Sequence, residues 1–293
     1  KQLQSKPAEV VYHDELSSEF RPVLFSGFME HAARHGLQYV SEATLPPPND
    51  PCFQPQVVAR AKALAGGDPI AEEQVIDFAR MRVYRETLLC HVEQAVDPDL
   101  SAEAFGQLRL ASRAESSPGG GGTLRAFTLP GGVRIESRDA TTVALMEHLI
   151  EAWPRSVPFA ELEGFLEIKG ELLDAEFFRL LLRLVVARMI ELHAWAAPVS
   201  RGIAERPRAS AVSRQGAIGG SRVTTLLHGS LGLDDPMVRR FLLLLDGTRD
   251  RKELLEALRV ECPEMPEAAL AEGIAPALQL LHRAGVLLEE GFG

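Results

Sequence analysis

The chain has 293 residues, of which 46% are hydrophobic and 25% are charged, and its formal net charge is −10. This length allows two or three domains with cores of their own. The negative charge argues against a general nucleic-acid binder, whose affinity depends on neutralising phosphates. The three cysteines are widely spaced and show neither a disulfide framework nor a paired metal-ligand spacing. This cysteine pattern indicates a reducing compartment, so we expect a cytoplasmic protein. No apolar run reaches the length of a membrane span.

The first predicted helix lies near the N-terminus. Pro22 suits the first turn of a helix, and the apolar residues after it repeat at helical spacing. Gly36 can end this helix because glycine tolerates positive φ. Residues 37–40 then alternate between apolar and polar, which predicts a short strand.

Two further helices are predicted in this region. Residues 56–65 form a short helix that Gly66 ends. Asp68 and Pro69 are typical of an N-cap and a first helical residue. Apolar residues continue at threes and fours after them, so we predict one long helix from Pro69 to about Val96.

A flexible linker is predicted over residues 114–122, because this segment consists almost entirely of serine, proline and glycine. The first domain would therefore span residues 1–113. After the linker, residues 124–129 and 133–136 alternate like strands, and the Pro-Gly-Gly between them is typical of a hairpin turn.

Three helices follow the hairpin and complete a winged-helix-like module over residues 123–197. Asp139 or Thr141 can cap the first of them. Residues 159–166 form the second, and residues 174–190 form a third that is strongly apolar on one face.

Residues 198–222 are rich in arginine, glycine and alanine and lack periodicity, so they are predicted to be an extended connection. Residues 223–293 repeat the layout of the middle module, with helices that begin near Pro236, after a turn, and at about Ala268. The predicted fold is mainly α with small β-hairpins. It has an N-terminal helical domain followed by two winged-helix-like modules.

Two ordered motifs in the first domain resemble a known family. The residues that carry the resemblance are His13-Asp14-Glu15, Phe25, His31, Gly36, Tyr39 and Glu42, and then Gln74, Asp77, Arg82, Arg85 and His91. They resemble the predicted methyltransferase regulatory domain, which follows the AdoMet-binding domain in a group of bacterial class I methyltransferases. That group includes protein-lysine methyltransferases that act on outer-membrane proteins. Residues from about Arg208 to Asp250 also resemble the C-terminal winged-helix domain of these lysine methyltransferases.

The resemblance implies a non-catalytic regulatory and substrate-positioning region of an AdoMet-dependent methyltransferase directed at protein lysines. S-adenosylmethionine would bind in a catalytic domain outside this chain, in the same gene product or in trans, and no cofactor is expected here. A protein substrate and a homodimer are the other expected partners. The motif residues expected to contact the substrate or the catalytic domain are His13, Asp14, Glu15, Phe25, His31, Tyr39, Glu42, Arg82 and Arg85.

The charged motif residues have two interpretations. The trio His13–Glu15 could carry out acid–base chemistry, or it could cap a helix or pair with arginines, and the structural role is favoured. Arg82 and Arg85 would lie with Asp77 on the long predicted helix, as part of a salt-bridged face.

No pattern of a catalytic centre stands out. The glycines at 119–122 follow Ser-Pro rather than an apolar strand, unlike the turn that approaches a dinucleotide or AdoMet. His31 and His35 share a helical face, as zinc ligands would, but two partly exposed helix histidines are favoured. Cys90, placed on the long helix, is expected to be a small buried hydrophobe rather than a nucleophile. No metal site is predicted.

The alternative function is a stand-alone winged-helix protein that binds DNA or a protein partner. The third helix of the middle module carries Arg179, Arg183 and Arg188 among many apolar residues, which is too apolar for a helix that reads a DNA groove. Nucleic-acid binding is therefore disfavoured. An enzyme with a site assembled from scattered residues is the third and least favoured hypothesis.

Overall fold

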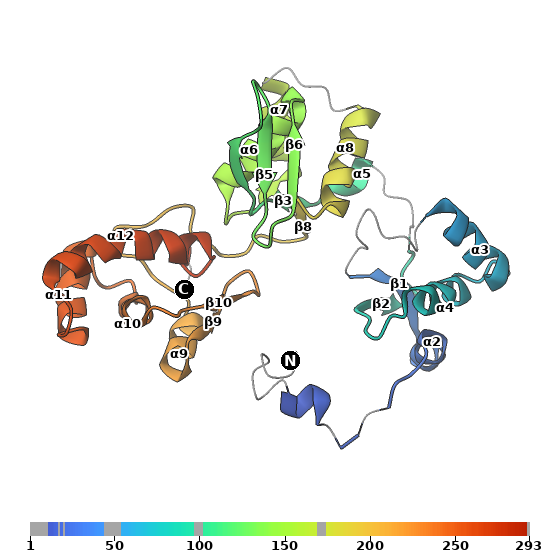
Figure 1. Cartoon of the computed structure of the whole chain (residues 1–293), viewed down its shortest axis with the longest axis horizontal. Coiled ribbons are helices and arrows are strands. Elements are labelled where there is room, and N and C mark those ends of the chain that lie inside the picture. The colour runs from blue at the N-terminus through green and yellow to red at the C-terminus, as the bar shows by residue number, and fades with distance from the viewer. Residues whose placement is uncertain are drawn as a thin grey trace. The chain divides into compact units, whose positions relative to one another are not determined.

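The computed structural model describes residues 11–16, 18–19, 21–43, 54–96, 102–168 and 174–291. The chain divides into two compact units, Lys1–Asp99 and Leu100–Gly293. Helices dominate both, and the strands of the described residues form small antiparallel sheets (Figure 1). The predicted fold class, mainly α with small hairpins, is therefore confirmed. Within the described residues, no helix is long and apolar enough to cross a bilayer.

The first unit combines helices with a two-stranded sheet. Its described elements are η2 (Val11–Glu15, a π-helix), α2 (Phe25–Arg34), β1 (Leu37–Glu42), α3 (Pro55–Ala65), α4 (Pro69–Arg80) and β2 (Thr87–His91). Helix α2 buries Phe25, Met29 and Ala32 against residues of β1, β2 and α4. It begins three residues after the predicted Pro22, because Leu24 still has extended backbone (φ −71°, ψ 148°). Gly36 ends it with φ +71°, as predicted.

The single helix predicted over 69–96 is wrong. Helix α4 ends at Arg80, where Met81 takes a left-handed conformation (φ 49°) and its N–H bonds back to the carbonyls of Asp77 and Phe78. The chain then enters β2, which pairs antiparallel with β1 and sets Thr87 opposite Glu42. The apolar residues of β2 fit both the helical spacing and the alternation of a strand. Pairing with β1 makes this segment a strand. Cys90 consequently lies half-buried on a strand.

The middle module combines two three-stranded sheets with helices. Its elements are α5 (Ala102–Phe105), β3 (Arg109–Ala111), β4 (Glu115–Pro118), β5 (Arg125–Thr128), β6 (Arg134–Ser137), α6 (Ala140–Ala152), β7 (Val157–Pro158), α7 (Phe159–Ile168), α8 (Ala175–Val186) and β8 (Glu191–His193). The strand orders are β4-β5-β6 and β7-β3-β8. Helix α8 buries Phe177, Leu181 and Leu184 in this core, as expected for a packing helix rather than a groove reader.

The flexible linker predicted over 114–122 is not observed. Ala114 is fully buried, and residues 115–118 form β4, in which Ser116 pairs with Phe127 of β5. Gly119–Gly122 lie between the two strands, where the N–H of Gly119 bonds to the carbonyl of Leu124. Composition misled the prediction because main-chain pairing needs no particular side chain. The division between the two units lies at Asp99/Leu100 instead. The hairpin predicted over 124–136 is confirmed as β5–β6.

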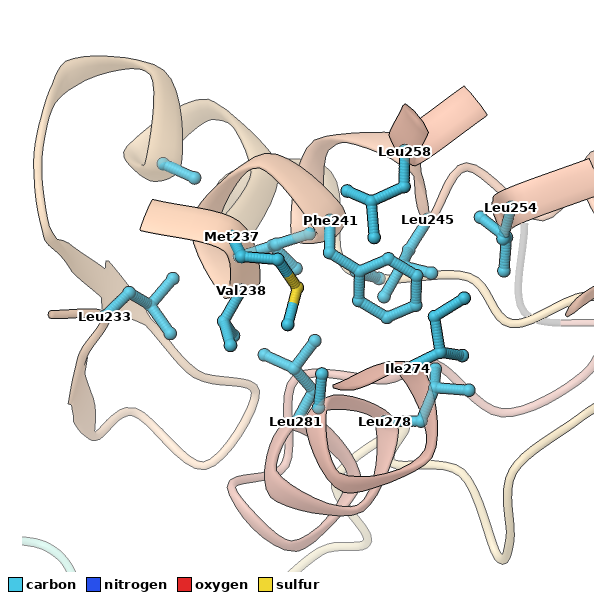
Figure 2. Packing of buried hydrophobic residues seen from close by; sticks show 14 of the residues in the cluster. Leu233, Met237, Val238, Phe241, Leu245, Leu254, Leu258, Ile274, Leu278 and Leu281 are labelled. Carbon is cyan, nitrogen blue, oxygen red and sulfur yellow. The ribbon is translucent and has the colours of Figure 1, made fainter. Parts of the chain in front are cut away.

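The C-terminal module has a core of its own. Its elements are α9 (Ala211–Gly219), β9 (Arg222–Thr224), β10 (Ser230–Gly232), α10 (Pro236–Leu244), α11 (Arg251–Glu261) and α12 (Glu267–Arg283). Figure 2 shows Phe241 of α10 pointing into the space between Leu254 and Leu258 of α11 and Ile274 and Leu278 of α12. All five side chains are buried.

The extended connection predicted over 198–222 is wrong, because this segment belongs to the C-terminal module. Ser210 caps α9, and Val199 and Ala209 form β-bridges with Leu288 and Leu287. The small residues that resemble a linker pack into the module instead, since Ser213 and Ala217 of α9 are buried. Composition alone does not separate flexible from closely packed glycine.

Aspartate side chains cap several helices of the second unit. Asp139, Asp174 and Asp235 each accept hydrogen bonds from backbone N–H groups in the first turn of their helices. Asp250 forms a complete capping box with Glu253 at the start of α11. Each cap satisfies donors that a helix start leaves unpaired.

Asp246 gives the C-terminal module an acid-sensitive turn. Its carboxylate accepts hydrogen bonds from the N–H of Thr248 at 3.0 Å and from Arg249 at 2.7 Å. Burial opposes ionisation, but the hydrogen bonds from Thr248 and Arg249 outweigh it and lower the pKa of Asp246 from 3.8 to about 2. Because the pKa of Asp246 is lower in the folded state, its carboxylate stabilises the fold at pH values above the unfolded-state pKa. That contribution is lost as pH falls from 3.8 to about 2.

We expect Asp246→Asn to flatten the acid limb of the stability–pH curve over this range. Two measurements check this prediction: an NMR titration of the Asp246 carboxyl in the native chain, and thermal unfolding of both chains at each pH. A native Asp246 that titrates at its ordinary value would contradict the prediction.

Candidate functional site

Five of the predicted motif residues converge in the first unit. Phe25 comes from α2, Tyr39 and Glu42 come from β1, and Arg82 and Arg85 come from the irregular segment between α4 and β2. The structure joins them with Glu73 and Asp77 of α4, and we call these seven residues the charge cluster. These residues come from segments that are far apart in the sequence. They meet because α4 ends just before Met81 and because β2 then pairs with β1.

Arg85 is the centre of the cluster. Its guanidinium lies 3.1 Å from a carboxylate oxygen of Glu42 and 3.1 Å from one of Asp77, and it also pairs with Glu73. The same guanidinium lies over the Phe25 ring, 3.6 Å from its centroid, which is a cation–π contact. The Arg85 side chain is only 12% exposed, so these interactions are weakly screened by solvent.

Arg82 shares two of these carboxylates. It lies 3.4 Å from Glu42 and 3.4 Å from Asp77. Glu42 also accepts hydrogen bonds from the N–H of Glu86 at 3.2 Å and from the hydroxyl of Thr87 at 3.1 Å. The carboxylate of β1 therefore fastens both arginines and the start of β2. Three carboxylates and two guanidiniums leave a formal surplus of one negative charge.

Burial shifts the ionisation of two members of the cluster. Desolvation is the main effect on Asp77 and raises the pKa of its carboxyl, although Arg85 and Arg82 act in the opposite direction. Desolvation, followed by the charges of Glu73 and Glu42, raises the pKa of Tyr39 from 10.0 to about 12. The Tyr39 ring also packs edge-on against Phe25, with centroids 5.2 Å apart.

The raised pKa of Tyr39 predicts a stability loss at high pH. The folded state favours the neutral phenol, so this contribution is fully present below pH 10.0 and is lost as pH rises toward 12. We expect the difference between the ultraviolet phenolate titrations of the native chain and a Tyr39→Phe variant to be centred near pH 12. A titration difference centred at the ordinary pKa of tyrosine would contradict the prediction.

A pocket of about 510 Å³ lies beside the charge cluster. Its charged lining comes from Arg21, Asp77, Arg82 and Arg85, and its apolar lining includes Val23, Phe25, Phe28, Val83 and Tyr84. The charged groups of the cluster are already paired with one another, so the arrangement offers a shaped surface rather than a free acid or base.

The other predicted site residues lie elsewhere. His31 is exposed on α2, and its ring is tilted by 60° to that of His35, with ring centroids 4.8 Å apart. His13 is exposed in η2, and the side chains of Asp14 and Glu15 lie outside the described part of the chain. Among the described residues, no group of three His, Cys, Asp or Glu side chains could hold a metal ion.

Glu73 is absent from the residues predicted for the site. Asp77 lies beside Arg82 and Arg85 as predicted, although α4 ends at Arg80 and the three residues do not share one helix. Glu73 and Asp77 are four residues apart on α4, so they lie on one face of that helix. This spacing, together with two arginines after the helix, is the signal that could have identified both carboxylates.

Comparison with known proteins identifies both ends of the chain. The family described as the predicted methyltransferase regulatory domain matches residues 7–91. The family described as the PKMT C-terminal winged helix domain matches residues 205–269. The charge cluster lies wholly within the first match.

Solved structures share the fold of nearly the whole chain. PKMT2 from Rickettsia typhi superposes with a TM-score of 0.82 over 98% of this chain and 63% of that chain, at 16% identity. PKMT2 in complex with AdoHcy gives 0.81 over 97% of this chain and 62% of that chain, also at 16% identity. This identity establishes likeness of fold alone. The chain thus spans less than two thirds of the length of these related structures.

A curated relative covers a smaller part. Uncharacterized protein RP789 from Rickettsia prowazekii (strain Madrid E) is 33% identical over 89 residues, which are 30% of this chain and 16% of that protein. The sequence matches and the shared fold agree with the motifs found at both ends of the chain. Residues 7–91 are thus similar to the predicted methyltransferase regulatory domain, and residues 205–269 are similar to the PKMT C-terminal winged helix domain.

Proposed function

We propose that this chain is the regulatory and substrate-positioning part of an AdoMet-dependent methyltransferase that acts on protein lysines. The observation that carries the proposal is the match of residues 7–91 to the methyltransferase regulatory domain, over the same residues that build the charge cluster. The PKMT winged-helix match supports the protein-directed reaction. A related structure holds AdoHcy, which is the product left when AdoMet gives up its methyl group.

The regulatory domain acts by presenting a fixed surface. Arg82 and Arg85 tie the segment after α4 to β1 and α4, so its exposed side chains are held in place before any partner arrives. Surfaces ordered in advance bind with a smaller loss of entropy. Among the described residues, most of the exposed large apolar side chains lie between Tyr12 and Val96. Apolar exposure of this kind is typical of a surface that a partner covers.

Methyl transfer itself is assigned to a catalytic domain outside this chain. A class I site needs a glycine-rich turn that leads from a strand into a helix. Here Gly119–Gly122 connect two antiparallel strands, so they do not fit AdoMet. The role of this chain is to bind and orient the polypeptide. A cytoplasmic location and a homodimer stay predictions.

Methyl transfer from labelled AdoMet tests the proposal. The full-length gene product is compared with its catalytic domain alone and with that domain plus this chain in trans. We expect added chain to restore or alter methylation of the protein substrate. No effect on methylation, together with no binding to the catalytic domain, would overturn the regulatory function and favour a stand-alone binding module.

A further inference from the structure

Exposed apolar side chains gather around the pocket of the regulatory domain. Val83 and Tyr84, in the segment between α4 and β2, are 99% and 76% exposed, and Val23, ahead of α2, is 73% exposed. These three side chains line the same pocket, together with Phe28. Single exposed apolar residues are ordinary on a protein surface, but a group around one pocket indicates a binding site.

The main chain of this segment is also available for pairing. Within the part of the chain that the structure describes, β2 pairs with β1 alone, and neither Val83 nor Tyr84 makes a main-chain hydrogen bond. The residues on either side are fastened: the N–H of Arg82 donates to Asp77 at 2.9 Å, and the carbonyl of Glu86 accepts from Ala43 at 2.7 Å. A fixed segment with unpaired N–H and C=O groups is a template for an added strand.

The lining of the pocket narrows the chemistry of its occupant. Arg82 and Arg85 line it, and the carboxylates of Glu42, Glu73 and Asp77 are already paired with them. The pocket therefore offers no free carboxylate to the ammonium of a lysine. The apolar lining instead fits a large aliphatic or aromatic side chain, whose burial stabilises a complex. The whole chain carries a net charge of −10, which favours the approach of a lysine-rich polypeptide at longer range.

We propose that Val83–Arg85 and the adjoining pocket bind an extended segment of the polypeptide substrate and take one of its large apolar side chains, not its lysine. The inference rests on the proposed function for the identity of the polypeptide. Main-chain pairing along Val83 and Tyr84 would supply affinity, and the pocket would supply selectivity for the apolar residue.

Fluorescence polarisation with the complete 293-residue chain tests the site. The probes are labelled peptides that alternate lysine with threonine and differ only at a central position, which is leucine, phenylalanine or glycine. We expect the leucine and phenylalanine peptides to bind at least about tenfold more tightly than the glycine peptide. Equal binding of all three peptides, or binding of none, would overturn the proposal.

Two substitutions separate the side-chain and main-chain contributions. We expect Tyr84→Ala and Val83→Pro each to weaken binding of the leucine peptide at least about fivefold. The first removes apolar area, and the second removes an N–H donor. Val260→Ala, at an exposed position on α11, is the matched control and should change nothing. Far-UV circular dichroism confirms that each variant is folded. Unchanged peptide binding in both pocket variants contradicts the inference.

A last comparison separates this proposal from the proposed function. If the apolar surface instead seats the catalytic domain, Tyr84→Ala will weaken binding of that domain in trans and leave the peptide unaffected, which overturns the inference but not the regulatory function. If the peptide binds as expected but added chain leaves methylation unchanged, the regulatory function fails while the polypeptide site stands.

Discussion

Replacement of Phe241 by alanine is expected to destabilise the C-terminal winged-helix domain by about 3–5 kcal/mol. Phe241 is fully buried, and its ring fills the space where α10 faces α11 and α12 (Figure 2). The surrounding leucine and isoleucine side chains come from two other helices, so they cannot all move inward to fill the space left by the ring. The predicted cost therefore includes the loss of buried apolar area and the cavity that remains.

Urea unfolding followed by tryptophan fluorescence measures this effect. The two tryptophans, Trp153 and Trp195, both belong to the second unit, and all three tyrosines belong to the first. The indole N–H of Trp153 donates to the carbonyl of Arg283 at the end of α12, at 2.7 Å, so its emission should report on the C-terminal core. Val260→Ala, at an exposed position, should change the unfolding free energy by less than about 0.5 kcal/mol. A change of similar size for Phe241→Ala would contradict the prediction.

The features predicted correctly from the sequence are those set by neighbouring residues. Asp68 and Asp139 cap helices as expected because a cap needs only the next few residues. Gly36 and Gly66 end helices in the left-handed region for the same reason. The hairpin over 124–136 also depends on its own turn.

The errors arise where distant segments decide the structure. Residues 87–91 form β2 because β1 lies beside them, which no local period reveals. Residues 115–118 form β4 because β5 pairs with them, although their composition is typical of a linker. The segment 198–222 is fastened by bridges to Leu287 and Leu288, at the far end of the chain. Pairing partners many residues away carry the missing information.

The candidate site shows the same division. The motif resemblance selected Phe25, Tyr39, Glu42, Arg82 and Arg85 together, and the structure brings these five into one cluster. It could not assign their contacts, because the predicted long helix placed both arginines on a helical face. His31 belongs to the same motif but lies exposed on α2, so a shared motif does not establish a shared site.

Arg85 is the residue whose loss should most affect the regulatory domain. Arg85→Ala would leave Glu42, Glu73 and Asp77 with Arg82 as the cluster's remaining cation, and would uncover the Phe25 ring. Removing one partner of a buried ion pair leaves an uncompensated charge. Because Glu73 is partly exposed, we expect the lower end of that cost, about 3 kcal/mol.

Hydrogen exchange of the β1 and β2 amides measures the loss locally, since both strands depend on the cluster. The tryptophan transition of the second unit serves as an internal reference and should stay unchanged. Arg60→Ala, at an exposed position on α3, is the matched control and should leave exchange as it is. Arg85→Lys should recover only part of the stability, because one ammonium cannot replace a planar guanidinium shared by three carboxylates.

The origin of the cost can be tested by a second substitution. If the loss in Arg85→Ala comes from uncompensated charge, adding Asp77→Asn should recover part of it, because burial already raises the pKa of the Asp77 carboxyl and favours its neutral form. If the loss comes instead from the apolar packing of Arg85 on Phe25, the double variant will be no more stable than Arg85→Ala. The second outcome would show that packing, not charge pairing, holds the segment after α4 in place.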